Sequence, residues 1–391
     1  MTKIQQTPYF ILREKLLRQN VEAFSTALAA EWPNASIAYS VKTNALPYVL
    51  RWMNEHGVLA EAVSDDEYEL AALCGFEDGH MVFNGPVKGA ETFARAARQG
   101  AYINIDSKND LALLKKEPPK APERIGVRIN IPTELFGEVD IGYEEDGFRF
   151  GFSWENGVLG QVIETLRTLF GHTRFGLHTH VNSLTRSPEV YRRTARYVAG
   201  IVQEYGLEPS FIDVGGGFFG GVPEKPGPLE YIRTVKAELM SAVDPQKTRL
   251  IVEPGSAIIG SAIELHTTVV DVKDTARSRI VTTDGSRVHI DPLWRKMRYL
   301  FFTDAQRSPF PRQIVCGYTC MDHDRIMTLE NEPELMVGDH IVYHRVGNYT
   351  VTFGGPFIKG LPPVYVEQED GTIVMIRKLM DMNEFYRMET C

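Results

Sequence analysis

Three residue types that can do chemistry each follow a strongly apolar stretch of this sequence. Lys42 comes at the end of SIAYSVK, three glycines follow FIDV in DVGGG, and Glu253 follows LIV in EPG. An ammonium group enclosed in an apolar core is costly unless it is paired or neutralised. Lys42 therefore either lies at the surface or serves a chemistry that requires burial.

The glycine run, Gly215 to Gly217, exposes consecutive backbone N–H groups that no Cβ obstructs. Such N–H groups after a strand suit the binding of a phosphate dianion. Taken alone, the run fits an ordinary loop equally well.

Eight apolar, β-branched segments alternate with amphipathic ones, which indicates the elements that position these residues. The predicted strands are 36–42, 59–64, 81–84, 102–106, 124–130, 174–181, 210–214 and 249–253. Helical periodicity between them is clearest in PEVYRRTARYVAGIVQEYG, where apolar residues recur at spacings of three and four. Eight strand–helix alternations predict an α/β fold, a parallel (β/α)8 TIM barrel.

After Gly255 the sequence changes to short runs rich in Val, Ile, Thr and Tyr, which predict an all-β domain. We therefore expect a barrel over residues 25–265 and a β-sandwich or barrel-like domain over 266–391, joined by the N-terminal segment 1–24. The long, acidic, glycine-rich segment 132–148 is typical of a mobile loop over a site, and its role stays open.

Composition excludes several classes of function. The chain has 391 residues, 43% of them apolar, and a formal net charge of −9. This charge argues against a general binder of nucleic acid. With no apolar run long enough for a membrane span and no secretion signal at the start, we expect a cytoplasmic protein. Cys316 and Cys320 lack zinc-ligand spacing, so we predict no metal site, and free thiols at Cys74, Cys316 and Cys391.

The strand ends of such a barrel carry its active site, and here all eight are polar. A single polar strand end is more often a solvated cap than a catalyst, but eight around one barrel mouth favour a site. They are Lys42, Glu61 with Ser64, Asn84, Asp106, Arg128 with Asn130, His178 with His180, the segment DVGGG, and Glu253.

Three of these features, Lys42, the glycine run and Glu253, make chemical sense together. A buried lysine can form a Schiff base with an aldehyde, and a glycine run can hold a phosphate. A carboxylate can keep a pyridine nitrogen protonated, which makes the ring an electron sink. Pyridoxal 5′-phosphate carries all three groups, so we predict that Lys42 binds this cofactor covalently.

Six ordered motifs resemble the fold type III pyridoxal-phosphate decarboxylases, a family that includes diaminopimelate and ornithine decarboxylases. They are YSVKTN, HTHVNS, DVGGG, EPG, GYTCMDHD and GNY. The resemblance implies a barrel of the alanine racemase type with a C-terminal β-domain, and an amino-acid decarboxylase. The cofactor contacts implied or expected are Lys42, Glu61, His180, Ser183, Gly215, Gly216, Gly217, Glu253, Gly255, Ser256 and Tyr349.

The resemblance also assigns a protonating role to Cys320. It implies a head-to-tail homodimer in which Cys320 and Asp324 of one chain complete the active site of the other. His178 does not fall on the ring-stacking position, so we interpret it as structural.

Departures from the family pattern bear on the substrate. Ser256 stands where EPGR has an arginine, and Met321 stands where an acidic residue follows the cysteine. The substitutions of Glu61 for an aspartate and Asn182 for a glycine are compatible with the same chemistry. A non-acidic residue after the cysteine resembles the branch that decarboxylates conjugated amino acids such as siderophore intermediates, with Arg295 or Lys296 to bind carboxylates.

Other functions stay open at this point. Asp322 or Asp324 could supply the missing carboxylate, which keeps an ordinary diaminopimelate- or ornithine-type decarboxylase possible. Racemases of this barrel type typically hold the ring nitrogen with an arginine, so Glu253 favours decarboxylation over racemisation. A non-catalytic regulator that binds the cofactor is a further alternative, against which the presence of both Lys42 and Cys320 argues.

Overall fold

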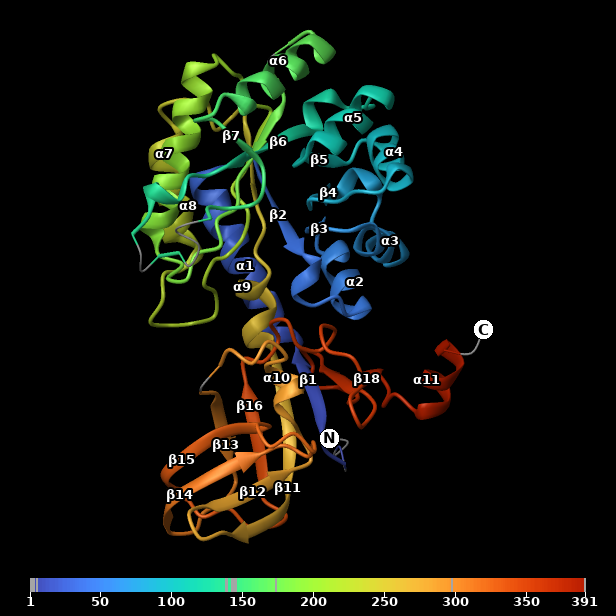
Figure 1. Cartoon of the computed structure of the whole chain (residues 1–391), viewed down its shortest axis with the longest axis vertical. Helices are drawn as coiled ribbons and strands as arrows, with labels where there is room; N and C mark the ends of the chain where they lie inside the picture. The colour runs from blue at the N-terminus through green and yellow to red at the C-terminus, as the bar shows by residue number, and fades with distance from the viewer. Residues whose placement is uncertain are drawn as a thin grey trace. The chain divides into compact units, whose positions relative to one another are not determined.

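A computed structural model describes residues 4, 6–137, 140–141, 146–172, 174–296 and 298–389. The chain divides into two compact units, one formed by Val21–Ala257 and the other by Met1–Asn20 with Ile258–Cys391. The boundary predicted at 265/266 falls inside a strand, β11 (Ile263–Asp274). Figure 1 labels the elements of both units.

The unit 21–257 is a closed parallel barrel, as predicted. Within the described residues the ring has eight strands, and the pairing of β10 with β2 closes it. They are β2 (Ala35–Ser40), β3 (Leu59–Ala62), β4 (Met81–Phe83), β5 (Tyr102–Ile105), β6 (Ile125–Asn130), β8 (Gly176–His178), β9 (Phe211–Asp213) and β10 (Arg249–Val252). A short strand, β7 (Phe152–Ser153), pairs with the end of β6.

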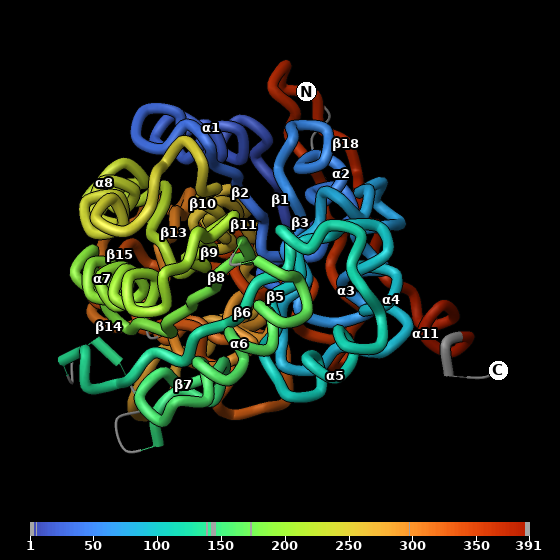
Figure 2. Tube along the Cα trace, turned by 90° about the horizontal axis from the view of Figure 1, so that it is seen from above, coloured from blue at the N-terminus to red at the C-terminus, as the bar shows by residue number. Residues whose placement is uncertain are grey.

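Helices surround this ring, as Figure 2 shows from above. They are α1 (Glu14–Glu31), α2 (Pro47–Glu55), α3 (Asp65–Leu73), α4 (Ala90–Gln99), α5 (Lys108–Lys116), α6 (Val158–Phe170), α7 (Pro188–Glu204) and α8 (Pro228–Leu239). Ser64 and Ser107 accept hydrogen bonds from the backbone N–H groups of Glu67 and Asp110, which caps α3 and α5. Ser64 therefore begins a helix, whereas the sequence had placed it in a strand.

Apolar side chains fill the interior of the barrel below its mouth. Tyr102 and Phe211 meet edge to face with ring centroids 5.2 Å apart, both buried. Phe211 needs the space left by two glycines, since a Cβ on Gly176 would lie 2.1 Å from its ring and one on Gly126 2.8 Å. This packed floor leaves the strand ends as the place for polar side chains.

The other unit is built around a sheet in the order β15-β14-β12-β11-β1-β17-β18, with β16 pairing both β11 and β13. The N-terminal strand β1 (Tyr9–Arg13) lies between β11 and β17 (Val364–Glu367), so the start of the chain belongs to this unit. The remaining strands are β12 (Arg279–Thr283), β13 (Leu300–Thr303), β14 (Pro309–Cys316), β15 (Arg325–Pro333), β16 (His340–His344) and β18 (Ile373–Arg377). Its short helices include α10 (Arg287–Ile290) and α11 (Met382–Glu389), and α9 (Ser256–Ile259) spans the boundary between the units. No helix in the described part of the chain has the length and hydropathy needed to span a bilayer.

Candidate active site

Lys42 lies at the mouth of the barrel and is paired. Strand β2 ends at Ser40, and the 3-10 turn Val41–Thr43 then turns Lys42 out of the strand, leaving its side chain 37% exposed. The structure thus corrects the expectation of an enclosed lysine. Its Nζ donates to Glu61 Oε2 at 2.7 Å, and Glu61 is 1% exposed.

Glu61 is held as a carboxylate at the end of β3. Burial raises its pKa, but the charge of Lys42 and hydrogen bonds from Lys42, Ser40 and Asn84 outweigh burial, so the pKa lies below its usual value. Ser40 Oγ donates at 2.6 Å and Asn84 Nδ2 at 3.0 Å. Glu61 therefore keeps a negative charge beside the amine of Lys42.

A second pair of carboxyl groups, Asp213 and Glu253, lies at the ends of β9 and β10. Both are buried and share a hydrogen bond in which Asp213 accepts. Burial raises the pKa of Asp213 to about 7. Burial, together with the neighbouring Asp213 and Glu61, raises the pKa of Glu253 well above its usual value. The raised pKa favours the protonated form of Glu253, which can donate a proton to a basic ring nitrogen.

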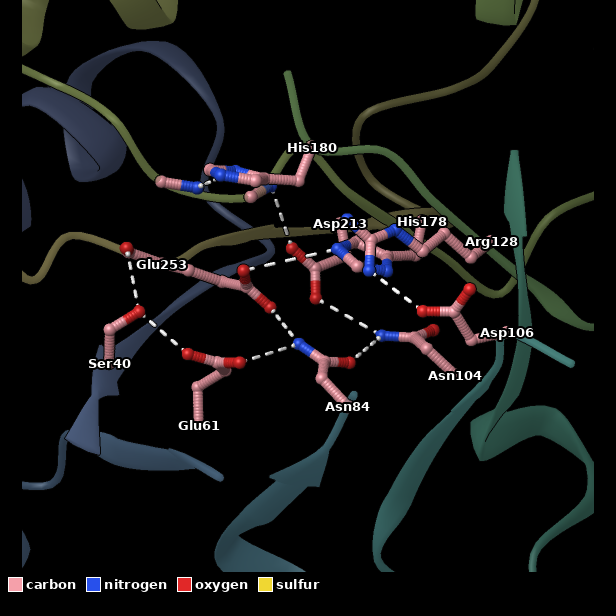
Figure 3. Close-up of polar contacts among 12 residues, drawn as sticks. Ser40, Glu61, Asn84, Asn104, Asp106, Arg128, His178, His180, Asp213 and Glu253 are labelled. Atoms are coloured by element: carbon pink, nitrogen blue, oxygen red, sulfur yellow. Dashed lines mark hydrogen bonds and ion pairs between the residues drawn. The ribbon is translucent and has the colours of Figure 1, made fainter. Parts of the chain in front are cut away.

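Two asparagines connect these acidic groups, as Figure 3 shows. Asn84 Nδ2 donates to Glu253 Oε1 at 2.5 Å as well as to Glu61, and Asn104 Nδ2 donates to Asn84 Oδ1 at 2.8 Å. The sequence had marked Asn84 only as a polar strand end and had missed Asn104. A polar residue inside the four-residue buried strand YINI was the available signal.

Both histidines of HTHVNS are neutral; His178 is buried, and His180 is intermediate between buried and exposed. Burial lowers the pKa of His180 to about 3, and the charges of Arg128 and Lys42 lower it further. Burial also lowers the pKa of His178 well below its usual value. His178 Nε2 lies 3.9 Å from Glu253 Oε2, and within the described residues neither of its ring nitrogens has a hydrogen-bond partner. His178, interpreted from the sequence as structural, thus stands beside Glu253.

Two buried ion pairs lie where β4, β5 and β6 end. Arg128 Nη1 donates to Asp106 Oδ2 at 2.8 Å, and Lys88 Nζ donates to Asp110 Oδ2 at 2.8 Å. Both side chains of the Lys88–Asp110 pair are fully buried. Asp110 also accepts the backbone N–H of Asp106, which joins the two pairs.

The glycine loop 215–217 packs too tightly for side chains. Gly215 and Gly217 have φ of +66° and +88°, values that favour glycine. A Cβ on Gly216 would lie 2.3 Å from the carbonyl oxygen of Glu253. The backbone of Gly216 also donates to His180 Nδ1 at 3.2 Å, which places the loop next to the imidazole.

These residues fit pyridoxal 5′-phosphate. The cofactor requires an accessible lysine for its aldehyde, a carboxyl group for its ring nitrogen and backbone N–H groups for its phosphate. Lys42, Glu253 and the glycine loop supply them within one unit. The neutral imidazole of His180 adds a flat face that the cofactor ring can stack on.

The other predicted residues are placed as follows. Ser183 Oγ accepts the backbone N–H of Arg186 in the barrel unit, and Ser256 begins α9 next to Gly255. Met321, Cys320, Asp322, Asp324 and Tyr349 belong to the other unit. There Cys320 is exposed and the side chain of Asp322 is 100% exposed.

Asp324 is 2% exposed and accepts hydrogen bonds from Ser286 Oγ, Thr319 Oγ1 and the backbone of Arg287, all within 2.9 Å. These bonds give it a structural role in its own unit. Cys74 and Cys316 are free thiols, and Cys391 lies outside the described residues.

The chain resembles known proteins along most of its length. Residues 15–260 match the model of the pyridoxal-dependent decarboxylase family, pyridoxal binding domain. A diaminopimelate decarboxylase of Archaeoglobus fulgidus is 27% identical, covering 88% of this chain and 83% of its own. A probable chloroplastic diaminopimelate decarboxylase of Oryza sativa is 25% identical, covering 99% and 80%.

Solved structures share the fold. The diaminopimelate decarboxylase of M. jannaschii superposes with a TM-score of 0.85 at 20% identity, covering 98% of this chain and 92% of the other. The enzyme of Helicobacter pylori complexed with L-lysine gives a TM-score of 0.82 at 22% identity, covering 99% and 97%.

The family model spans more than half of the chain and covers the barrel mouth at which Lys42, Glu253 and the glycine loop meet. The chain therefore belongs to the pyridoxal-dependent decarboxylases and is an amino-acid carboxy-lyase that uses pyridoxal 5′-phosphate.

Proposed function

We propose that this decarboxylase acts on a conjugated α-amino acid with a bulky polar side chain, of the kind made in siderophore assembly or other secondary metabolism. The observation that carries the proposal is Ser256, which starts α9 where the resembled family has an arginine. A serine hydroxyl cannot form the bidentate pair that a guanidinium makes with a carboxylate. A free distal carboxylate therefore lacks its clamp at this position.

Met321 supports the same substrate class. Its thioether cannot balance the distal ammonium of ornithine, lysine or diaminopimelate, whereas an acidic residue at this position could. A conjugated side chain without a free ammonium needs no such partner. Arg295 and Lys296 remain the proposed contacts for carboxylates of the conjugate.

The residues of the barrel mouth have separate roles in this proposal. When bound, the cofactor supplies a protonated pyridine ring that accepts the electron pair left after carbon dioxide departs. Glu61 orients Lys42 Nζ through their 2.7 Å contact. Glu253 would supply the proton for the ring nitrogen, and neutral His180 would stack on the ring. Cys320 returns a proton to the substrate α-carbon.

We also propose the head-to-tail homodimer, with Cys320 acting in the partner's site. The support is the resemblance of GYTCMDHD to the family segment that carries the catalytic cysteine. Its thiol is exposed, as a residue that acts on a second chain requires.

Diaminopimelate itself is the second candidate substrate. The relatives from A. fulgidus and O. sativa are both named for it, and the H. pylori structure holds L-lysine. In this alternative, exposed Asp322 supplies the carboxylate that Met321 lacks.

Carbon dioxide release from a panel of amino acids separates the two candidates. We expect diaminopimelate, ornithine and lysine to be poor substrates and one or more amide- or amine-linked conjugates to be turned over well. A kcat/KM for diaminopimelate of about 10⁴ M⁻¹s⁻¹ or more would contradict the proposal.

A designed variant tests the role of position 256 directly. Ser256→Arg should raise kcat/KM for diaminopimelate by restoring the anion clamp. Ser241→Arg, which adds the same charge at an exposed site beyond α8, should leave it unchanged. Equal effects of both variants would show that net charge, and not position 256, controls the substrate.

A further inference from the structure

Two buried asparagines form a hydrogen-bonded bridge across the barrel mouth. Asn84 directly follows β4 and Asn104 lies in β5, and they are 3% and 1% exposed. Asn104 Nδ2 donates to Asn84 Oδ1 at 2.8 Å and to Asp213 Oδ2 at 3.4 Å. Asn84 Nδ2 in turn donates to Glu61 Oε1 and Glu253 Oε1 (Figure 3). The two amides thus connect three buried carboxyl groups.

The contacts around Asn104 fix the direction of this bridge. Its two N–H groups meet two oxygen acceptors, while its own Oδ1 packs on Gly126, where a Cβ would lie only 2.3 Å away. Rotating the Asn104 amide by half a turn would set oxygen against the oxygens of Asn84 and Asp213. Since Asn84 Oδ1 is occupied as an acceptor, the Asn84 amide must direct its N–H groups toward Glu61 and Glu253.

A donor at Glu253 favours the ionised form of that side chain. Burial and two neighbouring acidic groups oppose ionisation, whereas a hydrogen bond to the carboxylate lowers the cost. The amide is well suited to this task because it does not titrate. Within the described residues, the charged or titratable groups near Glu253 include Lys42, Glu61, His178 and Asp213.

We propose that Asn84, held in one orientation by Asn104, is a positioning residue that allows Glu253 to give its proton to the cofactor ring nitrogen. The proton leaves the Glu253 carboxyl group and binds the pyridine nitrogen, and the resulting carboxylate keeps the hydrogen bond from Asn84. The inference rests on the decarboxylase function, in which the ring accepts electrons only when its nitrogen is protonated.

The same amide also joins the two ends of the site. One N–H group of Asn84 meets Glu61, the partner of Lys42, and the other meets Glu253. The bridge therefore fixes the distance between the carboxylate of Glu61, beside Lys42, and the carboxyl group of Glu253. A cofactor must span that separation to reach both.

The test uses protein loaded with pyridoxal 5′-phosphate that is ¹⁵N-labelled in its ring. The ¹⁵N chemical shift reports directly whether the ring nitrogen carries the proton, without any substrate. In Asn84→Leu we expect the equilibrium to move toward protonated Glu253 by about tenfold, as for loss of one hydrogen bond to a charged group. The infrared band of a protonated carboxyl group should then persist in the loaded variant.

Two further variants complete the design. Asn104→Leu removes no contact to Glu253, but it frees the Asn84 amide to rotate. The ¹⁵N shift of the ring should therefore change in the same direction as in Asn84→Leu, but by a smaller amount. Asn130→Leu is the matched control, because Asn130 is also a strand-end amide but donates to the carbonyls of Phe148 and Phe150. It should leave the ¹⁵N shift unchanged.

An unchanged ¹⁵N shift in loaded Asn84→Leu would overturn the inference. If that variant fails to fold, Asn104→Leu decides by the same criterion. A shift of equal size in Asn130→Leu would also overturn it, because the change would then follow from general loosening of the barrel. Failure of the decarboxylase function on which the inference rests is distinguishable, since it is absence of carbon dioxide release by the wild-type chain.

Discussion

Gly216→Ala isolates the effect of close packing at the glycine loop. Gly216 does not have the positive φ of its two neighbours, so its φ alone does not exclude alanine. The added Cβ would however lie 2.3 Å from the carbonyl oxygen of Glu253, against about 3.5 Å for a favourable contact. The two strand ends must therefore separate by about 1 Å, although the N–H of Glu253 is bonded to the carbonyl of Gly215 at 2.8 Å.

Overpacking of this kind costs about 1–3 kcal/mol. We expect urea unfolding of the cofactor-free variant to show a loss in this range, and titration with pyridoxal 5′-phosphate to show weaker binding, because Glu253 moves with its backbone. Gly227→Ala is the matched control, since a Cβ there meets nothing within 4 Å. If Gly216→Ala matched the control in both measurements, the proposed tight contact between the loop and Glu253 would be refuted.

Two more predictions concern assembly and acid stability. Mixing inactive Lys42→Ala chains with inactive Cys320→Ala chains should restore part of the activity, because some heterodimers regain one intact site; no recovery after verified subunit exchange would place both residues in one chain's site. In the β-rich unit, Glu264 is buried, which raises its pKa, but hydrogen bonds from His266 and Arg13 prevail and bring the pKa to about 2. Its charge therefore stabilises the fold above pH 4.5, the usual pKa, and this contribution is lost as pH falls toward 2. Glu264→Gln should cost at most about 3 kcal/mol near neutral pH, and denaturant unfolding of the two proteins should converge in acid; a constant difference at every pH would contradict the assignment.

The local sequence pattern was sufficient to predict the barrel, because each strand and helix has its own apolar periodicity. All eight predicted strands are present, and the helix PEVYRRTARYVAGIVQE begins at Pro188 and ends at Glu204. The predicted ends of the strands were less accurate than their presence. The sixth strand was predicted over 174–181 but comprises only Gly176–His178, because the chain then leaves the sheet to form the loop with His180.

The site residues predicted from the sequence in the barrel unit belong to contiguous motifs, and the structure brings them together at one barrel mouth. Lys42, Glu253 and the glycine loop each follow an apolar strand, and strand ends of a parallel barrel meet at one mouth whatever the loops between them do. Asn104 and Asp213 were not singled out as functional. Their partners come from other strands, and no local pattern indicates which side chains will meet across a ring.

By itself, the sequence determined the fold class and the cofactor and predicted the residues that would anchor it, since these depend on periodicity and on residue types next to strands. Only the tertiary structure decided the protonation states and the hydrogen-bond directions. Glu61 and Glu253 are both glutamates at strand ends, yet the pKa of Glu61 is lowered beside Lys42 and the pKa of Glu253 is raised beside Asp213. The physical reason is that burial and neighbouring charges set a pKa, and these arise only when distant segments pack together.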